Sequence, residues 1–155
     1  MNSEKHLRLT GGLIMNLQAA ETVLRYFLVL QEGQSKDFPR IGDTHAEETF
    51  ATNYMSLGYI IDIYNRGLDE VETLLYTVDR GIVHIRDAFA HGRLVTEADF
   101  PATLWKFGRA EKGNVPVEFS EALTEEWLVK TNNSVVQEKD KVIACSKARG
   151  YEALS

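Results

Sequence analysis

Three polar residues in the middle of the chain have types and spacing suited to phosphate chemistry: Arg86, Asp87 and His91. Cleaving an RNA phosphodiester without a metal ion needs a base for the 2′-hydroxyl, an acid for the leaving 5′-oxygen and a cation for the phosphoryl oxygens. Histidine can perform either proton transfer near neutral pH. Arginine offers a planar, permanently charged fork of donors that fits phosphate oxygens. We therefore expect Arg86 to bind the phosphate, His91 to transfer protons and Asp87 to orient one or both.

The spacing of these residues limits how they can meet one substrate. Positions five apart on an ideal helix lie about 140° apart around its axis, so Arg86 and His91 do not share a face. Unwinding near Gly92 would swing His91 round. A cleft between two copies of the chain solves the problem more simply, because the base and the acid can then come from different copies. The catalytic hypothesis therefore requires a homodimer.

Each of these residues also has an ordinary structural interpretation. Arg86 borders an apolar stripe and can pair with a carboxylate at the helix end, for which Asp87 is a local candidate. His91 falls in the last turn of the predicted helix, where a cation is favoured by the helix dipole. Arg93 and Lys106 could extend a phosphate-binding patch, although such residues are commonly plain surface charges.

The motif lies at the end of a predicted helix over residues 69–91. Asp69 is a suitable N-cap residue, and Gly92 suits the C-terminal end, where a residue in the left-handed conformation is common. The apolar positions between them recur at the helical period. They are Val71, Leu74, Leu75, Val78, Ile82, Ile85 and Phe89.

Three further helices are predicted, over about 12–31, 44–67 and 124–150. The first and last carry apolar residues at spacings of three, four and seven, which places each set on one face. Thr44 and Glu47 have the spacing of a capping box for the second helix, and Gly67 ends it. The apolar faces of the first and last helices are formed by Leu13, Leu17, Ala20, Leu24 and Phe27, and by Leu128, Val135, Val142 and Cys145.

The segment over about 103–119 changes to a β pattern. Residues 103–107 have β-forming types, and residues 115–119 alternate between apolar and other positions. The residues between them, 111–114, are turn-formers. Pro116 cannot donate to a strand ladder, so its strand should be an edge. The expected fold is therefore mainly α, an up-and-down four-helix bundle with a small β-hairpin before the last helix.

Composition indicates one ordinary globular domain over residues 1–155. The chain is 44% apolar and 26% charged, with a net charge of −6. This charge argues against broad coating of nucleic acid but leaves room for a local basic cleft. A single cysteine rules out an internal disulfide and fits a reducing, cytoplasmic location. No apolar run has the length of a membrane span. His45 and Glu48 are spaced like metal ligands, but their place in a first helical turn favours capping and solvent-exposed roles, so no metal or other cofactor is expected.

The Arg-Asp-x-x-x-His pattern formed by Arg86, Asp87 and His91 resembles the signature of HEPN domains (higher eukaryote and prokaryote nucleotide-binding). The hairpin around Trp105, Lys106 and Phe107, followed by residues 124–128, is similar to a hairpin-bearing subgroup of that family. The resemblance implies a HEPN-like four-helix bundle and metal-independent endoribonuclease activity of the toxin or defence type. It further implies RNA or a nucleotide as ligand, a site formed across a homodimer, and an antitoxin or regulatory protein as a further partner.

Two other functions remain open at this point. A catalytically inactive HEPN-like module would bind a nucleotide, an RNA or a protein through the same polar residues, and the acidic net charge favours it. Such a module predicts binding that depends on Arg86 without turnover. A purely structural dimer predicts that alanine at Arg86 and His91 changes neither binding nor activity.

Overall fold

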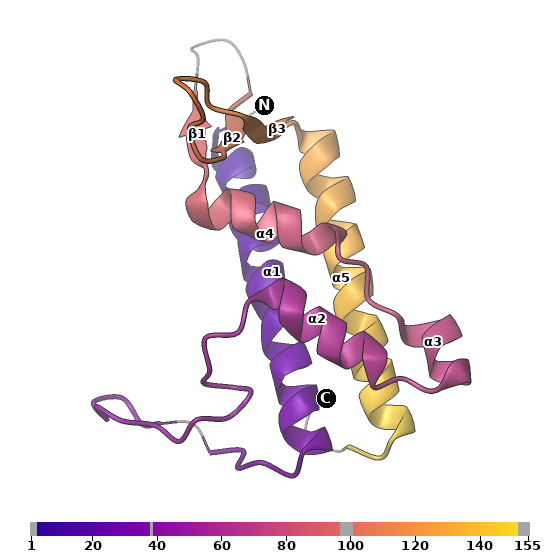
Figure 1. Ribbon diagram of the computed structural model, residues 1–155. Coiled ribbons are helices and arrows are strands. Elements are labelled where there is room, and N and C mark those ends of the chain that lie inside the picture. The colour runs from indigo at the N-terminus through magenta and orange to yellow at the C-terminus, as the bar shows by residue number, and fades with distance from the viewer. Residues whose placement is uncertain (1–2, 38, 97–100, 152–155) are drawn as a thin grey trace. The chain divides into compact units, whose positions relative to one another are not determined.

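The computed structural model describes residues 3–37, 39–96 and 101–151. This part of the chain is mainly helical and contains five helices and one small antiparallel sheet (Figure 1). By internal contacts the chain forms two compact units, residues 1–17 with 80–135 and residues 18–79 with 136–155. The helices are α1 (Ser3–Gln31), α2 (Leu57–Arg66), α3 (Glu70–Tyr76), α4 (Gly81–His91) and α5 (Glu125–Ala148).

The first unit joins α4 and the sheet to the first parts of α1 and α5. The strands β1 (Arg93–Val95), β2 (Thr103–Phe107) and β3 (Val117–Ala122) lie in that order, each antiparallel to its neighbour. Asn16 donates to Asn132 at 2.8 Å, which ties the α1 part to the α5 part of this unit. The core of this unit is formed by Leu13, Leu17, Ile82, Ala88, Leu104, Leu123, Leu128 and Val135.

The second unit packs α2 and α3 with the remaining parts of α1 and α5. Phe27 and Tyr64 are fully buried and meet edge to face, with ring centroids 4.9 Å apart. Asp69 caps α3 in a complete capping box, because its carboxylate accepts from Glu72 N while the Glu72 carboxylate accepts from Asp69 N. The expectation of Asp69 as an N-cap is confirmed.

The first and last helices agree best with their predictions. All nine residues assigned to their inner faces are buried, from Leu13 in α1 to Cys145 in α5. The structure begins the first helix at Ser3, nine residues before the predicted start. The last helix runs to Ala148, and Gly150 adopts a left-handed φ of 74° just beyond it.

The predicted second helix is wrong in its first half. No helix begins at Thr44; α2 begins at Leu57, where the Ser56 hydroxyl accepts from Tyr59 N. The preceding segment is held instead by side chains from elsewhere. Gln34 Oε1 accepts from Phe50 N, and Arg25 donates to the carbonyl oxygens of the same segment. The end of the helix at Gly67 is confirmed.

The predicted third helix is two helices, α3 and α4, separated by residues 77–80. The Asn65 side chain accepts from Val78 N at 3.0 Å and donates to Val78 O at 2.9 Å. The Glu138 carboxylate accepts from Asp79 N at 2.9 Å. These side chains replace the helical hydrogen bonds that a continuous helix would make. The α3 residues predicted to face the core are exposed: Val71, Leu74 and Leu75.

The predicted hairpin is part of a three-stranded sheet. Its strands are β2 and β3, and β3 is an edge strand as expected. The strand covers Val117–Ala122 rather than residues 115–119, so Pro116 precedes it. The turn contains Lys112 and Gly113, both with positive φ. The third strand, β1, was not predicted; Arg93 lies opposite Trp105 in its register with β2.

Among the described residues, the α1 stretch Glu4–Gln31 has the length and composition of a helix able to cross a membrane. The expectation from apolar run lengths was that no such stretch exists. A core helix of a soluble protein can meet the same criteria, and the inner stripe of α1 is buried within the protein at Leu13, Leu24 and Phe27.

Candidate functional site

The helix α4 carries the Arg86, Asp87 and His91 motif at its C-terminal end. It is anchored on one side by Ile82, which is 3% exposed, and by Ala88, which is fully buried. The helix continues through His91, and Gly92 N donates to Ala88 O at 2.7 Å. His91 is therefore helical, and Arg86 and His91 lie on opposite flanks of α4, about 140° apart.

Asp87 lies between the other two motif residues around the helix. Its Oδ1 atom is 3.5 Å from Arg86 Nη1, and both side chains are about one-third exposed. Asp87 and His91 are four residues apart, so they lie one turn apart and about 40° apart around the axis. His91 is exposed. The three side chains thus form an arc over the solvent-facing side of the helix end, with the carboxylate in its middle.

Gly92 allows the sheet to approach the end of α4. Its backbone is extended, with φ −81° and ψ −178°, so the expectation of a left-handed cap is wrong. A Cβ atom at this position would lie 2.2 Å from Ala88 O and 2.7 Å from Trp105 O. Only glycine fits between these two backbone oxygens. Because Gly92 is extended, the chain passes from His91 at the end of α4 directly into β1.

The two further cations predicted for a phosphate patch lie on different faces of the sheet. Lys106 Nζ is 2.9 Å from Glu118 Oε2 and points to the same face as the buried Leu104, two residues before it. Arg93 is exposed, and its guanidinium carbon lies 5.5 Å from the ring centroid of Phe107. Arg93 therefore follows the motif by two residues, whereas Lys106 is held in an ion pair with Glu118 on the other face of the sheet.

The proximity of Trp105 and Phe107 to Arg93 was not predicted from the sequence. The two rings lie parallel within 5°, with centroids 6.1 Å apart. The alternation of Trp105 and Phe107 along the strand is the signal that could have placed them on one face. The partner strand β1 was not predicted. Its register with β2 is what adds the arginine to this face.

A second polar cluster lies in the other compact unit, around Glu72 and Arg149. Arg149 Nε donates to Glu72 Oε1 at 2.7 Å, and Nη2 donates to Oε2 at 2.5 Å. These hydrogen bonds lower the pKa of Glu72 from its usual value to about 2. Arg149 also donates to Gly67 O and to Gln31 Oε1. The cluster thus links the ends of α1, α2 and α5 to α3, which is a structural role.

Two titratable groups beside this cluster are buried. Burial raises the pKa of the Tyr64 hydroxyl and of the Cys145 thiol. Cys145 Sγ lies 3.8 Å from Glu72 Oε1, and Tyr64 donates to Tyr76 O at 3.2 Å. A buried thiol beside a carboxylate stays protonated and unreactive. The expectation that Cys145 is a core residue is confirmed.

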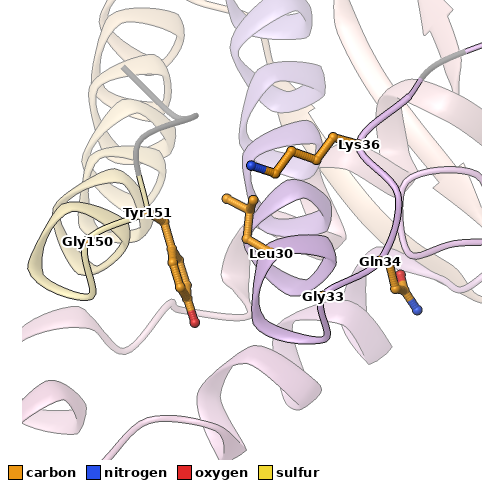
Figure 2. Close-up of a pocket in the computed structure, with 6 residues that line it drawn as sticks. All are labelled: Leu30, Gly33, Gln34, Lys36, Gly150 and Tyr151. Carbon is orange, nitrogen blue, oxygen red and sulfur yellow. The ribbon is translucent and has the colours of Figure 1, made fainter.

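A pocket of about 410 Å³ lies in the same unit where α1 and α5 end (Figure 2). Both helices end with a left-handed glycine, Gly33 at φ 63° and Gly150 at φ 74°. Lys36 is the charged residue in the lining, and Gln34 already accepts from Phe50 N. This lining supplies no acid–base pair. The lining residues are Leu30, Gly33, Gln34, Lys36, Gly150 and Tyr151.

Within the described residues, no group of three or more histidine, cysteine, aspartate or glutamate side chains is arranged to hold a metal ion. Comparison of the chain with protein-family models, with curated proteins and with solved structures gave no match. The arc of polar side chains at the end of α4 is therefore the candidate functional site.

Proposed function

We propose that this protein is a metal-independent endoribonuclease that acts as a homodimer, with Arg86 and His91 as its catalytic residues and Asp87 as a residue that positions them. The observation that carries the proposal is the arc of these side chains over the exposed end of α4. Arginine, carboxylate and imidazole are the groups that phosphodiester cleavage needs in the absence of a metal. The resemblance of their spacing to the HEPN signature supports the same reaction.

In this proposal Arg86 neutralises charge that builds on the phosphoryl oxygens. One imidazole accepts the proton of the 2′-hydroxyl as its oxygen attacks phosphorus. A second imidazole donates a proton to the departing 5′-oxygen. The products are a 2′,3′-cyclic phosphate and a 5′-hydroxyl, and the proton balance is closed by the two imidazoles. Asp87 acts as a positioning residue through its contact with Arg86.

The need for two copies follows from the helix geometry. Arg86 and His91 of one chain lie on opposite flanks of α4, so one phosphate cannot readily contact both. A two-fold dimer that brings both α4 ends to one cleft gathers two Arg86 and two His91 side chains, so groups on either side of the phosphate come from different copies. The same arrangement provides the two imidazoles that the proton transfers require.

The test is cleavage of a mixed RNA pool by the purified full chain in EDTA. We expect the native chain to cut, and both Arg86→Ala and His91→Ala to lower the rate at least a hundredfold, which is typical of losing a proton-transfer group. The matched controls are Arg66→Ala and His45→Ala, at exposed residues of the other unit. Full cleavage by either motif variant contradicts the proposal.

A non-catalytic binding module is the second candidate function. Arg86 is already in contact with Asp87, and the net charge of −6 disfavours strong general attraction of RNA. This candidate predicts that RNA or a nucleotide binds the native chain, that Arg86→Ala abolishes the binding, and that no cleavage product appears in either case.

A further inference from the structure

The face of the sheet that carries Arg93 also carries two aromatic side chains. Trp105 and Phe107 alternate along β2 and therefore point to one face. Arg93 lies directly opposite Trp105 in β1, and directly opposed residues share a face. The Arg93 guanidinium lies over the Phe107 ring, and the Trp105 and Phe107 rings are parallel. We refer to Arg93, Trp105 and Phe107 as the aromatic face.

The two faces of this sheet differ in how they are covered. Leu104, on the opposite face, is 3% exposed, and Phe119 there meets Trp127 of α5 edge to face. On the aromatic face, Phe107 is 39% exposed and Arg93 is exposed as well. An exposed phenylalanine beside a half-buried tryptophan leaves flat apolar surface open to a ligand.

We propose that the aromatic face binds an unpaired base of single-stranded RNA, with Arg93 contacting the adjoining phosphate. This inference rests on the proposed function, since it takes RNA as the ligand, and it adds the place where a base next to the scissile bond is held. Aromatic rings stack on every base, so the face favours unpaired RNA over paired RNA without reading its sequence.

Charge supports a nucleotide over an uncharged aromatic ligand. Among the described residues no carboxylate forms an ion pair with Arg93, and its guanidinium carbon lies 5.5 Å from the centroid of the Phe107 ring. A guanidinium at the edge of stacked rings can bind a phosphate while the rings hold its base. The net negative charge of the protein disfavours RNA binding elsewhere on its surface, so RNA would bind at this local site.

The position of the aromatic face relative to His91 supports the same ligand. Arg93 follows His91 by two residues, so their Cα atoms are at most about 7.6 Å apart. A single strand whose scissile phosphate lies at His91 can therefore place a neighbouring base on Trp105 and Phe107. Gly92 fixes this proximity, because it admits the backbone of β2 at the end of α4.

The test uses the fluorescence of Trp105 in the full chain. The chain has two tryptophans, so Trp127→Phe leaves Trp105 as the single emitter, and His91→Ala is added to prevent turnover. The probes are a short oligoadenylate, the same backbone without bases, and a blunt RNA duplex. We expect the oligoadenylate to quench Trp105 strongly and the other two probes to leave it nearly unchanged.

Variants then separate stacking from charge. Phe107→Leu should weaken oligoadenylate binding about tenfold, the effect of losing one stacked ring, while Phe107→Tyr should bind as the parent does. Arg93→Gln should weaken binding and reduce its dependence on salt. Leu94→Ala is the matched control, because Leu94 lies on the opposite face of β1 and is 54% exposed. Circular dichroism identifies any variant that has lost its fold.

Several results would overturn the proposal. Equal binding of the base-free backbone and the oligoadenylate would show that the rings do not stack on bases. Unchanged binding by Phe107→Leu would do the same. Trp105 emission that changes with protein concentration alone would assign the aromatic face to a second copy of the chain. Because cleavage is measured separately on the native chain, a failure of catalysis leaves this test interpretable.

Discussion

At the scale of single residues, Gly92 decides how the motif joins the sheet. We predict that Gly92→Ala destabilises the protein by about 2 kcal/mol, because the added methyl group overlaps two backbone oxygens and forces the end of α4 away from β2. Thermal or urea unfolding measures this. Gly11→Ala is the control: Gly11 is within α1 with open space around it, so alanine there should stabilise by up to about 1 kcal/mol. An unchanged stability of Gly92→Ala would contradict the close approach.

Glu72 gives a prediction about pH. Its pKa is lowered in the folded protein to about 2 by Arg149, against an ordinary value of 4.5. A lowered folded-state pKa stabilises the fold above the ordinary value, and this contribution is lost as pH falls from about 4.5 to about 2. We predict that Glu72→Gln costs about 2 kcal/mol at neutral pH.

The difference between native and Glu72→Gln chains should shrink in urea unfolding at pH 3 relative to pH 7. Glu70→Gln is the matched control, since Glu70 is exposed in the same first turn of α3. A difference of equal size at both pH values would show that the Arg149 ion pair is not its source.

Sequence patterns predicted correctly those structural features that depend on residues close together in the chain. The Asp69 cap, the end of α2 at Gly67 and the inner faces of α1 and α5 all depend on neighbours within a few positions. The aromatic face could not be predicted in the same way. It depends on the register of β1 against β2, and β1 has only three residues, too few for a period-two pattern.

At the scale of elements, Arg25 organises the segment before α2. Its guanidinium donates to Phe50 O at 2.9 Å, Asn53 Oδ1 at 2.9 Å and Met55 O at 2.6 Å, while Glu21 pairs with it from the preceding turn. We predict that Arg25→Ala speeds hydrogen exchange and proteolysis in residues 50–55 and costs about 2 kcal/mol. Arg66→Ala, at an exposed position of α2, should change neither. Unaltered exchange in this segment would contradict the assignment.

The same contacts explain why two helices were predicted wrongly. The periodicity over residues 44–56 and 77–80 is compatible with helix. In the first segment, Arg25 and Gln34 occupy backbone groups that a helix would pair internally. In the second, Asn65 and Glu138 do so. These partners lie at least 13 residues away in sequence, so no local pattern could reveal them.

At the scale of the whole molecule, the proposed cleavage requires two copies acting together. An acidic chain gains little RNA affinity from its overall charge, so the proposed dimer would gather two Arg86 and two Arg93 side chains and concentrate positive charge at the proposed site. The position of Arg86, Asp87 and His91 at the end of one helix was predictable from sequence because they lie within six residues of one another. The proposal that two chains share the site rests on the helix geometry and on the helical conformation of His91.

The most direct test of the shared site is to refold the native chain together with His91→Ala chains. The two are unfolded together, refolded as an equal mixture, and assayed in EDTA beside native chain refolded at the same total concentration. Random pairing gives about one quarter native dimers, one half mixed dimers and one quarter variant dimers. If each cleavage needs an imidazole from both copies, only the native dimers cut, and the mixture should show about a quarter of the native rate. A rate of about half the native value, in a mixture shown to contain mixed dimers, would mean that each copy acts alone and would contradict a site shared between copies.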